Sequence, residues 1–392
     1  MIERDIKERL LYLSTKFPVV SVSGPRQSGK TTLLKDTFQE YTYVSLENLN
    51  NLEFAESDPV GFLSTYDDKV ILDEVQRVPK LFNYLQGKVD EKNSPGQFLI
   101  SGSQNFLLME RITQSLAGRV GLLTLLALSQ HELARGGFDA SIVATTLFNG
   151  GYPRLYSQEI SPAEFYPSYV STYLERDVRE LSAVQSLVSF QNFLSLCAGR
   201  VGNILDVYNL ALSAGVDVKT SKRWLSILTA SYLVDFLHPY FKNFNKRLVK
   251  RPKLYFTDTG LVSYLLGLSN EKEVGLSAFY GPLFENYVYL ELKKYLNLQP
   301  SMNHVWFWNE TATNEVDFIF GPEHNLKVVE VKSSATYDVK WFKSMKIFCE
   351  LASVKPENKY VVYAGDELIK TSNGIIVPWK RLSEVLQEEV ES

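Results

Sequence analysis

Cysteine and histidine are scarce in this chain of 392 residues, which has 2 cysteines and 4 histidines. The cysteines, Cys197 and Cys349, are too few for a disulfide-stabilised scaffold and are typical of a reducing compartment. The histidines lack the spacing that zinc ligands need, and no Ser-His-Asp or Cys-His pattern is present. We therefore expect neither zinc chemistry nor hydrolysis of the serine- or cysteine-protease type.

Long apolar runs are also missing. The longest, from Val120 to Leu128, is far shorter than the ~20 residues that a membrane-spanning helix needs. Residues 1–7 carry several charges where a secretory signal would be apolar. These features predict a soluble cytoplasmic protein with no membrane partner, and the length predicts two or three domains at ~150 residues each.

The net charge of −4 conceals one strongly basic segment. Between Lys219 and Lys253 there are nine basic residues and one acid, Asp235, so this segment carries +8 and the remainder −12. A basic block in an otherwise acidic chain is typical of a module that faces nucleic acid. A solvated, lysine-rich surface is the alternative, and charge alone does not separate the two.

Residues 17–34 have the pattern of a buried strand, a phosphate-binding loop and the start of a helix. The loop matches G-x-x-x-x-G-K-[ST], in which backbone N–H groups converge on phosphate oxygens at a helix N-terminus. Lys30 is predicted to reach the β- and γ-phosphates of ATP, and the Thr31 hydroxyl to bind Mg²⁺. The predicted nucleotide-binding residues here are Gly24, Pro25, Arg26, Gln27, Ser28, Gly29, Lys30, Thr31 and Thr32.

A second apolar strand, residues 69–73, ends in two acids. Asp73 is placed to hold the magnesium, directly or through water. Glu74 is placed to orient or deprotonate the attacking water. A plain strand-end cap is the alternative, and the phosphate loop upstream favours catalysis.

Further strands are predicted at residues 43–46, 97–101 and 120–126, which completes a parallel five-stranded sheet. Ser103 and Gln104 follow the strand at 97–101, at the sheet edge where a γ-phosphate would lie, and are candidate phosphate sensors. Arg119 precedes the last strand. It is a candidate to neutralise transition-state charge in a neighbouring subunit, which would make the protein a homo-oligomer; a surface salt bridge is the alternative.

These motifs resemble the prokaryotic AAA-type ATPases of the AAA_14 family, whose C-terminal halves carry the domain of unknown function DUF4143. The resemblance rests on residues 24–32, Leu-Asp-Glu-Val-Gln at 72–76, Ser-Gly-Ser-Gln at 101–104 and Ser-Leu-Ala-Gly-Arg at 115–119. Residues 150–153 and 173–177 also fit, so it spans nearly the whole chain. It implies an AAA-like core with a five-stranded sheet, a winged-helix region and a nuclease-like C-terminal domain.

The middle of the chain has the pattern of a helix-turn-helix. Residues 207–216 and 221–233 read as helices joined by a tight turn at 217–220, and residues 237–255 read as a hairpin with a basic tip. Such a module binds DNA largely through phosphate contacts, and protein binding is its alternative use. Residues 256–261 are assigned a structural role. The predicted DNA-binding residues are Lys219, Lys222, Arg223, Lys246, Arg247, Lys250 and Arg251.

The last third contains acids on alternating strands. Glu315 and Asp317 are predicted to share one face, opposite Val316 and Phe318, and Glu330 and Lys332 to share a face of the strand at 327–332. Buried acids are costly unless they hold a cation. Oxygen ligands suit Mg²⁺ or Mn²⁺, and a lysine beside them can orient water or stabilise a phosphate.

This order of residues resembles the PD-(D/E)XK nuclease superfamily: a glutamate on a helix, an aspartate on a strand, then Glu-x-Lys. The resemblance implies that Asp317 and Glu330 bind metal, that Glu285 completes the site and that Lys332 is catalytic. No proline precedes Asp317, so this chain departs from the pattern there.

The sequence as a whole predicts an α/β protein in four parts. These are an AAA-like P-loop ATPase core at 1–140, a helical lid or connector at 141–188, a winged-helix DNA-binding module at 189–265 and a nuclease-like α/β domain at 275–392. The first functional hypothesis is a Mg²⁺-dependent ATPase that binds duplex or branched DNA and cuts it, in DNA repair or defence. The second is an ATP-controlled DNA- or protein-binding switch with an inactive nuclease-like domain. An enzyme that acts on RNA is a weaker third, because a groove-sized helix and a wing suit duplex DNA.

Overall fold

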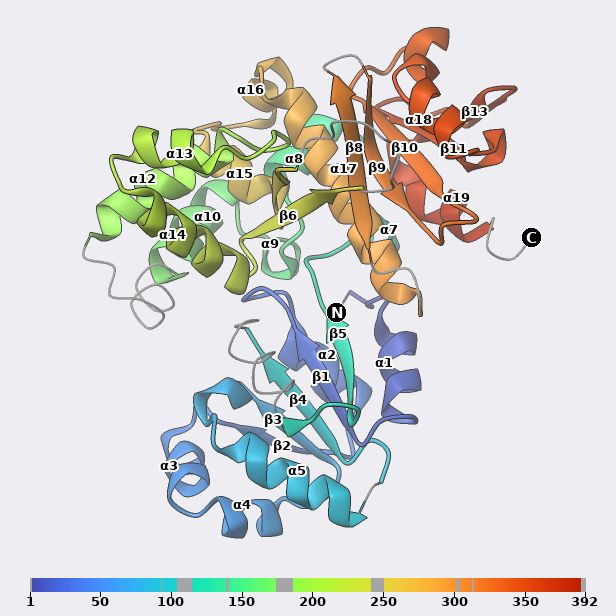
Figure 1. The fold of residues 1–392 in the computed structure, drawn as a ribbon. Helices are drawn as coiled ribbons and strands as arrows, with labels where there is room; N and C mark the ends of the chain where they lie inside the picture. The colour runs from blue at the N-terminus through green and yellow to red at the C-terminus, as the bar shows by residue number, and fades with distance from the viewer. Residues whose placement is uncertain are drawn as a thin grey trace. The chain divides into compact units, whose positions relative to one another are not determined.

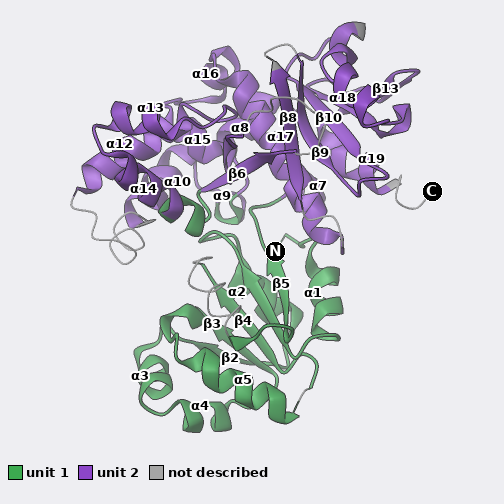
Figure 2. Ribbon diagram, in the orientation of Figure 1, with its two compact units in different colours: residues 1–128, 152–154, 227–233 green, residues 129–151, 155–226, 234–392 purple. Residues whose placement is uncertain are grey.

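The computed structural model describes residues 2–92, 94–103, 115–138, 141–173, 186–240, 250–300, 304–311 and 314–388. The chain forms two compact units, which Figure 2 shows in separate colours. Unit 1 contains residues 1–128, 152–154 and 227–233, and unit 2 contains residues 129–151, 155–226 and 234–392. Each unit has its own sheet, as Figure 1 shows.

Unit 1 is built on a parallel five-stranded sheet in the order β2-β3-β4-β1-β5, which confirms the predicted sheet. Every residue of β1, β3 and β4 is buried, as expected for inner strands that are covered on both faces. Because all five strands are parallel, the segments that follow β1, β3 and β4 lie at one edge of the sheet. The strands are β1 (Val19–Ser23), β2 (Thr42–Ser45), β3 (Val70–Asp73), β4 (Phe98–Gly102) and β5 (Val120–Thr124).

One face of this sheet packs against helices that follow β2 and β3. Phe62 of α4 and Leu81 and Leu85 of α5 belong to one buried cluster with Val70 and Ile100 of the sheet. The helices of unit 1 are α1 (Lys7–Ser14), α2 (Lys30–Thr37), α3 (Leu49–Ser57), α4 (Pro59–Thr65), the short η1 (Val75–Arg77) and α5 (Leu81–Lys92).

Unit 2 combines helices with an eight-stranded mixed sheet in the order β12-β13-β11-β10-β9-β8-β6-β7. The β6–β7 hairpin, which the sequence assigns to a wing, is therefore continuous with the sheet of the C-terminal region, because β6 pairs with β8 in parallel. The strands are β6 (Val234–Pro239), β7 (Lys253–Phe256), β8 (Val305–Thr311), β9 (Asn314–Phe320), β10 (Lys327–Lys332), β11 (Lys359–Tyr363), β12 (Ile369–Thr371) and β13 (Gly374–Pro378).

The long helix α17 crosses this sheet, and Tyr289 of α17 stacks on Tyr255 of β7 with ring centroids 4.5 Å apart. A second core cluster joins Trp308, Val316 and Ile319 of the sheet to Phe348 of α18. The helices are α7 (Gln130–Arg135), α8 (Val143–Asn149), α9 (Pro153–Ser157), α10 (Pro162–Tyr173), α12 (Leu187–Ala198), α13 (Val207–Ala214), α14 (Val218–Ala230), α15 (Thr259–Leu265), α16 (Glu271–Leu276), α17 (Tyr280–Leu298), η3 (Val339–Lys343), α18 (Lys346–Leu351), η4 (Pro356–Asn358), η5 (Trp379–Arg381) and α19 (Leu382–Glu388).

The helix pair predicted at the centre of the chain is present, with one boundary changed. Helix α13 ends at Gly215, whose φ of 66° is the left-handed conformation that glycine adopts at helix ends. Helix α14 begins at Val218, three residues earlier than predicted, because the Asp217 side chain accepts a hydrogen bond from the Thr220 N–H (2.8 Å) and so caps the helix. Lys219 is therefore on the helix and not in the turn.

In the part of the chain that the structure describes, no helix combines the length and the apolar character that a membrane crossing requires.

Candidate functional site

The phosphate-binding loop links β1 to α2 and depends on two glycines. Gly24 has a φ of 144°, and a Cβ there would lie 2.2 Å from the Leu125 carbonyl oxygen. Gly29, directly before α2, has a φ of 93°. Gln27 also has a positive φ, of 60°, which is uncommon for a residue other than glycine. The loop is thus held in the curled conformation that directs backbone N–H groups to one point.

Lys30 lies within this loop, as predicted. Its side chain is buried, and its ammonium donates hydrogen bonds to the carbonyl oxygens of Gly24 (3.0 Å) and Pro25 (2.8 Å). The Ser28 hydroxyl is fully buried and has no hydrogen-bond partner among the described residues. A buried cation and an unsatisfied hydroxyl beside a helix N-terminus suit a phosphate group. Arg26 is half-buried, and Gln27 and Thr32 are exposed.

Thr31 and Asp73 come together at the edge of the sheet. The Thr31 hydroxyl donates to Asp73 Oδ2 at 2.9 Å, and Tyr43 donates to the same oxygen at 2.8 Å. Ser101 donates to the other oxygen, Oδ1. Burial, followed by this bond to Asp73, raises the pKa of Tyr43 to about 12. A hydroxyl and a carboxylate at this spacing are the side-chain groups that hold Mg²⁺ with a bound nucleotide, so these residues fit that ion.

Glu74 and Ser103 also meet, although 29 residues separate them. Ser103 donates to Glu74 Oε2 at 3.2 Å, and Gln76 donates to the same oxygen. Glu74 has a φ of 56°, a left-handed conformation that is rare for a side chain of this size and is concentrated at functional sites. The predicted base and one predicted sensor therefore belong to one arrangement. Gln104, the second predicted sensor, lies outside the described residues.

Arg119 is placed away from the phosphate loop of its own chain. It precedes β5, whereas the loop follows the neighbouring parallel strand β1, so the two lie at opposite edges of the sheet. Its guanidinium binds both carboxylate oxygens of Asp90, with Nε–Oδ1 at 2.5 Å and Nη2–Oδ2 at 2.9 Å. This pairing raises the pKa of Arg119 and lowers that of Asp90. In this structure Arg119 therefore makes the surface salt bridge that the sequence left as the alternative.

The basic residues of α14 form an exposed face. Lys219, Lys222 and Arg223 are spaced at i, i+3 and i+4 and are exposed, whereas Trp224 is buried against Phe190 (ring centroids 5.3 Å apart). The core therefore fixes the orientation of the helix and leaves the three cations available to a partner. We call Lys219, Lys222 and Arg223 the α14 basic face.

The other predicted DNA contacts divide into two groups. Lys250 and Arg251 are exposed, and Arg251 pairs with Asp206 Oδ2 at 2.5 Å. Lys246 and Arg247 lie outside the described residues. Lys253 was counted in the basic segment, but it is buried and does not belong to a surface cluster.

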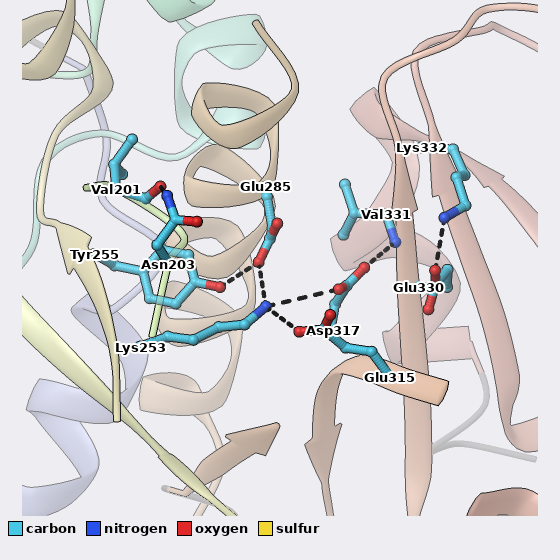
Figure 3. Close-up of polar contacts among 10 residues, drawn as sticks. All are labelled: Val201, Asn203, Lys253, Tyr255, Glu285, Glu315, Asp317, Glu330, Val331 and Lys332. Carbon is cyan, nitrogen blue, oxygen red and sulfur yellow. Dashed lines mark hydrogen bonds and ion pairs between the residues drawn. The ribbon is translucent and has the colours of Figure 1, made fainter. Parts of the chain in front are cut away.

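Lys253 instead lies among the acids of the C-terminal region, as Figure 3 shows. Its ammonium is 2.7 Å from Glu315, 2.9 Å from Glu285 and 3.9 Å from Asp317. Tyr255, two residues later on β7, donates to the same oxygen of Glu285. Burial opposes the charge, but the carboxylates of Glu285, Asp317 and Glu315 raise the pKa of Lys253 above its ordinary value, so it remains protonated. We call Lys253, Glu285, Glu315 and Asp317 the Lys253 cluster.

A β-bulge interrupts the pairing of β9 with β8 beside this cluster. Ile319 pairs with Trp306 and Val316 with Trp308, so β9 advances three residues where β8 advances two. The predicted shared face of Glu315 and Asp317 agrees with the structure, because both reach Lys253. The predicted place of Phe318 is wrong: Val316 and Ile319 pack into the same core cluster, whereas Phe318 stacks on Tyr289 of α17. The extra residue therefore moves Phe318 to the side of the sheet that faces α17.

The predicted nuclease residues form two separate sets of contacts in Figure 3. Asp317 Oδ2 accepts a hydrogen bond from the Val331 N–H (2.8 Å), and burial, followed by Glu330 and Glu285, raises its pKa well above the ordinary value. Glu330 pairs with Lys332 at 2.6 Å. Among the described residues, no three His, Cys, Asp or Glu side chains are arranged to hold a metal ion. Glu285, Asp317 and Glu330, the predicted ligands, therefore do not meet the requirement for a metal site in this structure.

Two contacts involve residues that sequence analysis did not assign to a site. Arg4 donates to the Ser28 carbonyl oxygen at 2.7 Å and so braces the phosphate loop. Tyr232, which follows α14, donates to the Ser23 hydroxyl at 2.7 Å, one residue before Gly24. The only signal for Lys253 in the sequence was its charge, which pointed to the surface.

Asp258 has the structural role that was predicted for its segment. It caps α15 through the Leu261 N–H (2.9 Å), and it accepts hydrogen bonds from the Gly151 N–H (2.8 Å) and the Tyr166 hydroxyl (2.7 Å). A Cβ at Gly150 would lie 2.4 Å from Asp258 Oδ1, so this turn requires glycine. The bonds join three segments of unit 2 that are far apart in sequence.

Comparisons with known families agree with these observations. Residues 16–134 match the AAA domain family AAA_14, residues 140–272 match the domain of unknown function DUF8612 and residues 280–382 match DUF4143. The chain thus carries an AAA_14 domain and a DUF4143 domain, as the motifs predicted. An AAA domain supports ATP hydrolysis, and its fold implies a bound nucleotide, usually with Mg²⁺.

Among curated proteins, Mb2031c of Mycobacterium bovis and Rv2008c of Mycobacterium tuberculosis are each 28% identical to this chain over 376 residues. Each alignment covers 95% of this chain and 82% of the relative, and both relatives are described as uncharacterized proteins. Among solved structures, the Walker-type ATPase PABY2304 of Pyrococcus abyssi is similar with a TM-score of 0.46 and 14% identity, covering 68% of this chain and 96% of that one. RuvB of Thermotoga maritima follows with a TM-score of 0.31 and 16% identity, covering 59% and 88%.

Proposed function

We propose that this protein is a Mg²⁺-dependent ATP hydrolase that controls the binding of duplex DNA. The arrangement at the sheet edge supports hydrolysis: Lys30 for the phosphates, Thr31 and Asp73 for Mg²⁺, and Glu74 held by Ser103 for the attacking water. In such a site the protein contributes mainly position and charge, because the reaction itself needs little covalent chemistry from it.

The α14 basic face is the observation that carries the DNA-binding half of the proposal. Three exposed cations share one side of the second helix of a helix-turn-helix, while the opposite side is buried. In this motif the second helix enters the major groove, and basic residues on it bind phosphates. A protein partner is less favoured, because the centre of a protein interface is usually apolar and poor in lysine.

Tyr232 supports a link between the two activities. Residues 227–233, which include the end of α14, belong to unit 1, and their Tyr232 is bonded to Ser23 at the start of the phosphate loop. A change in the loop on nucleotide binding would act on this bond. We therefore propose that ATP alters DNA affinity through Ser23 and Tyr232.

DNA cleavage, the first hypothesis from the sequence, is not part of this proposal. The acids predicted to bind its metal are paired with lysines, and we derive no step through a metal at that place. We propose instead the second hypothesis, a DNA-binding switch whose nuclease-like region does not cut DNA.

The test is DNA binding by a variant in which Lys219, Lys222 and Arg223 are all alanine. Fluorescence anisotropy with a labelled duplex is measured over a range of salt concentrations. Each phosphate contact contributes ~0.9 to the slope of log K against log salt, so the loss of three should lower the slope by about 2.7 and weaken binding. The matched control replaces the exposed Lys80, Lys346 and Lys355 by alanine, which removes the same charge elsewhere. Equal effects in the two variants would show that only net charge matters and would refute the proposed interface.

A further inference from the structure

We propose that Lys253 is the resident cation of the Lys253 cluster and takes the place of the divalent metal ion that the resemblance to nucleases predicts there. The inference rests neither on ATP hydrolysis nor on DNA binding. It follows from the way in which one ammonium satisfies three carboxylates in a buried position.

The distances support this assignment. Glu315 and Glu285 are both within 3 Å of the ammonium, and Asp317 is within ion-pair range at 3.9 Å. The side chain of Lys253 is only 5% exposed, so its charge is removed from water and depends on these partners. The acids come from α17 and β9, and the lysine comes from β7.

Lys253 is also held firmly at its backbone. It pairs with Leu237 in the β6–β7 ladder and forms a bridge to Ile204 on its other side. Its ammonium lies 5.6 Å from the ring centre of Phe307, and its partner Glu285 is bonded to Tyr255. Because both the main chain and the acid are fixed, the ammonium cannot swing away without the loss of several contacts.

The charge balance explains why a metal ion is not needed. Glu285 and Glu315 are the close partners of Lys253, while Asp317 also accepts a hydrogen bond from the Val331 N–H. A divalent ion at the same place would bring two further positive charges next to a buried ammonium, and like charges in such a site repel strongly. Removal of the ammonium alone would leave the neighbouring carboxylates of Glu285, Glu315 and Asp317 without this cation, and carboxylate oxygens are the ligands that Mg²⁺ and Mn²⁺ prefer.

The test is direct binding of Mn²⁺ without nucleotide, measured by electron paramagnetic resonance on the full chain. We expect wild type to show no Mn²⁺ binding that depends on Asp317. Lys253→Met should bind Mn²⁺ at least ten-fold more tightly than wild type, and the double variant Lys253→Met/Asp317→Asn should lose that gain. Lys332→Met is the matched control, because it removes a lysine that is paired with another acid, Glu330, while Lys253 stays in place, and it should leave Mn²⁺ binding unchanged.

Two results would overturn the inference. One is Mn²⁺ binding by wild type that disappears in Asp317→Asn. The other is a folded Lys253→Met, with the circular dichroism spectrum of wild type, that gains no Mn²⁺ binding. If Lys253→Met does not fold, the comparison of wild type with Asp317→Asn still decides the matter, since it needs no change at Lys253.

Discussion

Replacement of Glu74 by glutamine should separate nucleotide binding from hydrolysis. The amide has the shape of the carboxylate and can still accept the bond from Ser103 (3.2 Å in wild type), but it cannot take a proton from water. General-base catalysis contributes ~10² to 10⁴ in rate, or about 2.7 to 5.4 kcal/mol of activation free energy. The turnover of Glu74→Gln should fall by that factor, while ATP binding remains because the phosphate loop is intact.

Removal of the Ser103 hydroxyl should have a smaller effect on turnover. Ser103→Ala removes one long hydrogen bond to Glu74 and leaves its charge, so we expect a loss of about 1 kcal/mol, roughly five-fold in turnover. The assay is phosphate release at saturating ATP, with ATP affinity measured separately by a fluorescent analogue. Lys30→Ala is the reference, because it should lose binding. Turnover of Glu74→Gln within two-fold of wild type would refute the assignment of Glu74 as the base.

Two further variants test contacts away from the chemistry. Tyr232→Phe removes the bond to Ser23 and should leave basal turnover unchanged, while the difference in DNA affinity between the ATP-bound and nucleotide-free protein becomes smaller; an unchanged difference would argue against this link. Tyr166→Phe removes a buried hydrogen bond to Asp258 and should lower the free energy of unfolding by about 1.5 to 3 kcal/mol, measured by urea denaturation. A loss below 0.5 kcal/mol would mean that Asp258 is satisfied without Tyr166.

Much of the nucleotide site could be predicted from the sequence, because its geometry is local. The loop from Gly24 to Thr31 folds between one strand and one helix, and its conformation depends on glycine at fixed positions. The approach of Asp73 to Thr31 also follows from the sequence, since parallel strands end at a common edge. The sequence placed Ser103 and Glu74 at the same edge of the sheet, but it did not predict the hydrogen bond between them.

The C-terminal region shows where this reasoning fails. A period of two predicts alternating faces only while a strand is regular, and the bulge in β9 places Phe318 against α17. The order of acids and lysine along 285–332 contains no information on which cation neutralises the acids. That cation comes from β7, more than thirty residues before Glu285.

The sequence by itself determined the AAA domain, its phosphate loop and its acidic strand end, because those features depend on neighbours in the chain and on the edge of one parallel sheet. The tertiary structure alone decided whether Lys253 is exposed or buried and which acids it pairs with. Its positive charge suggested solvent and DNA, but the pairing of β6 with β8 carries β7 into the eight-stranded sheet and its lysine into a buried group of acids. The role of a charged residue can be inferred only when its partners are known. Partners from distant segments are fixed by the packing of the whole unit.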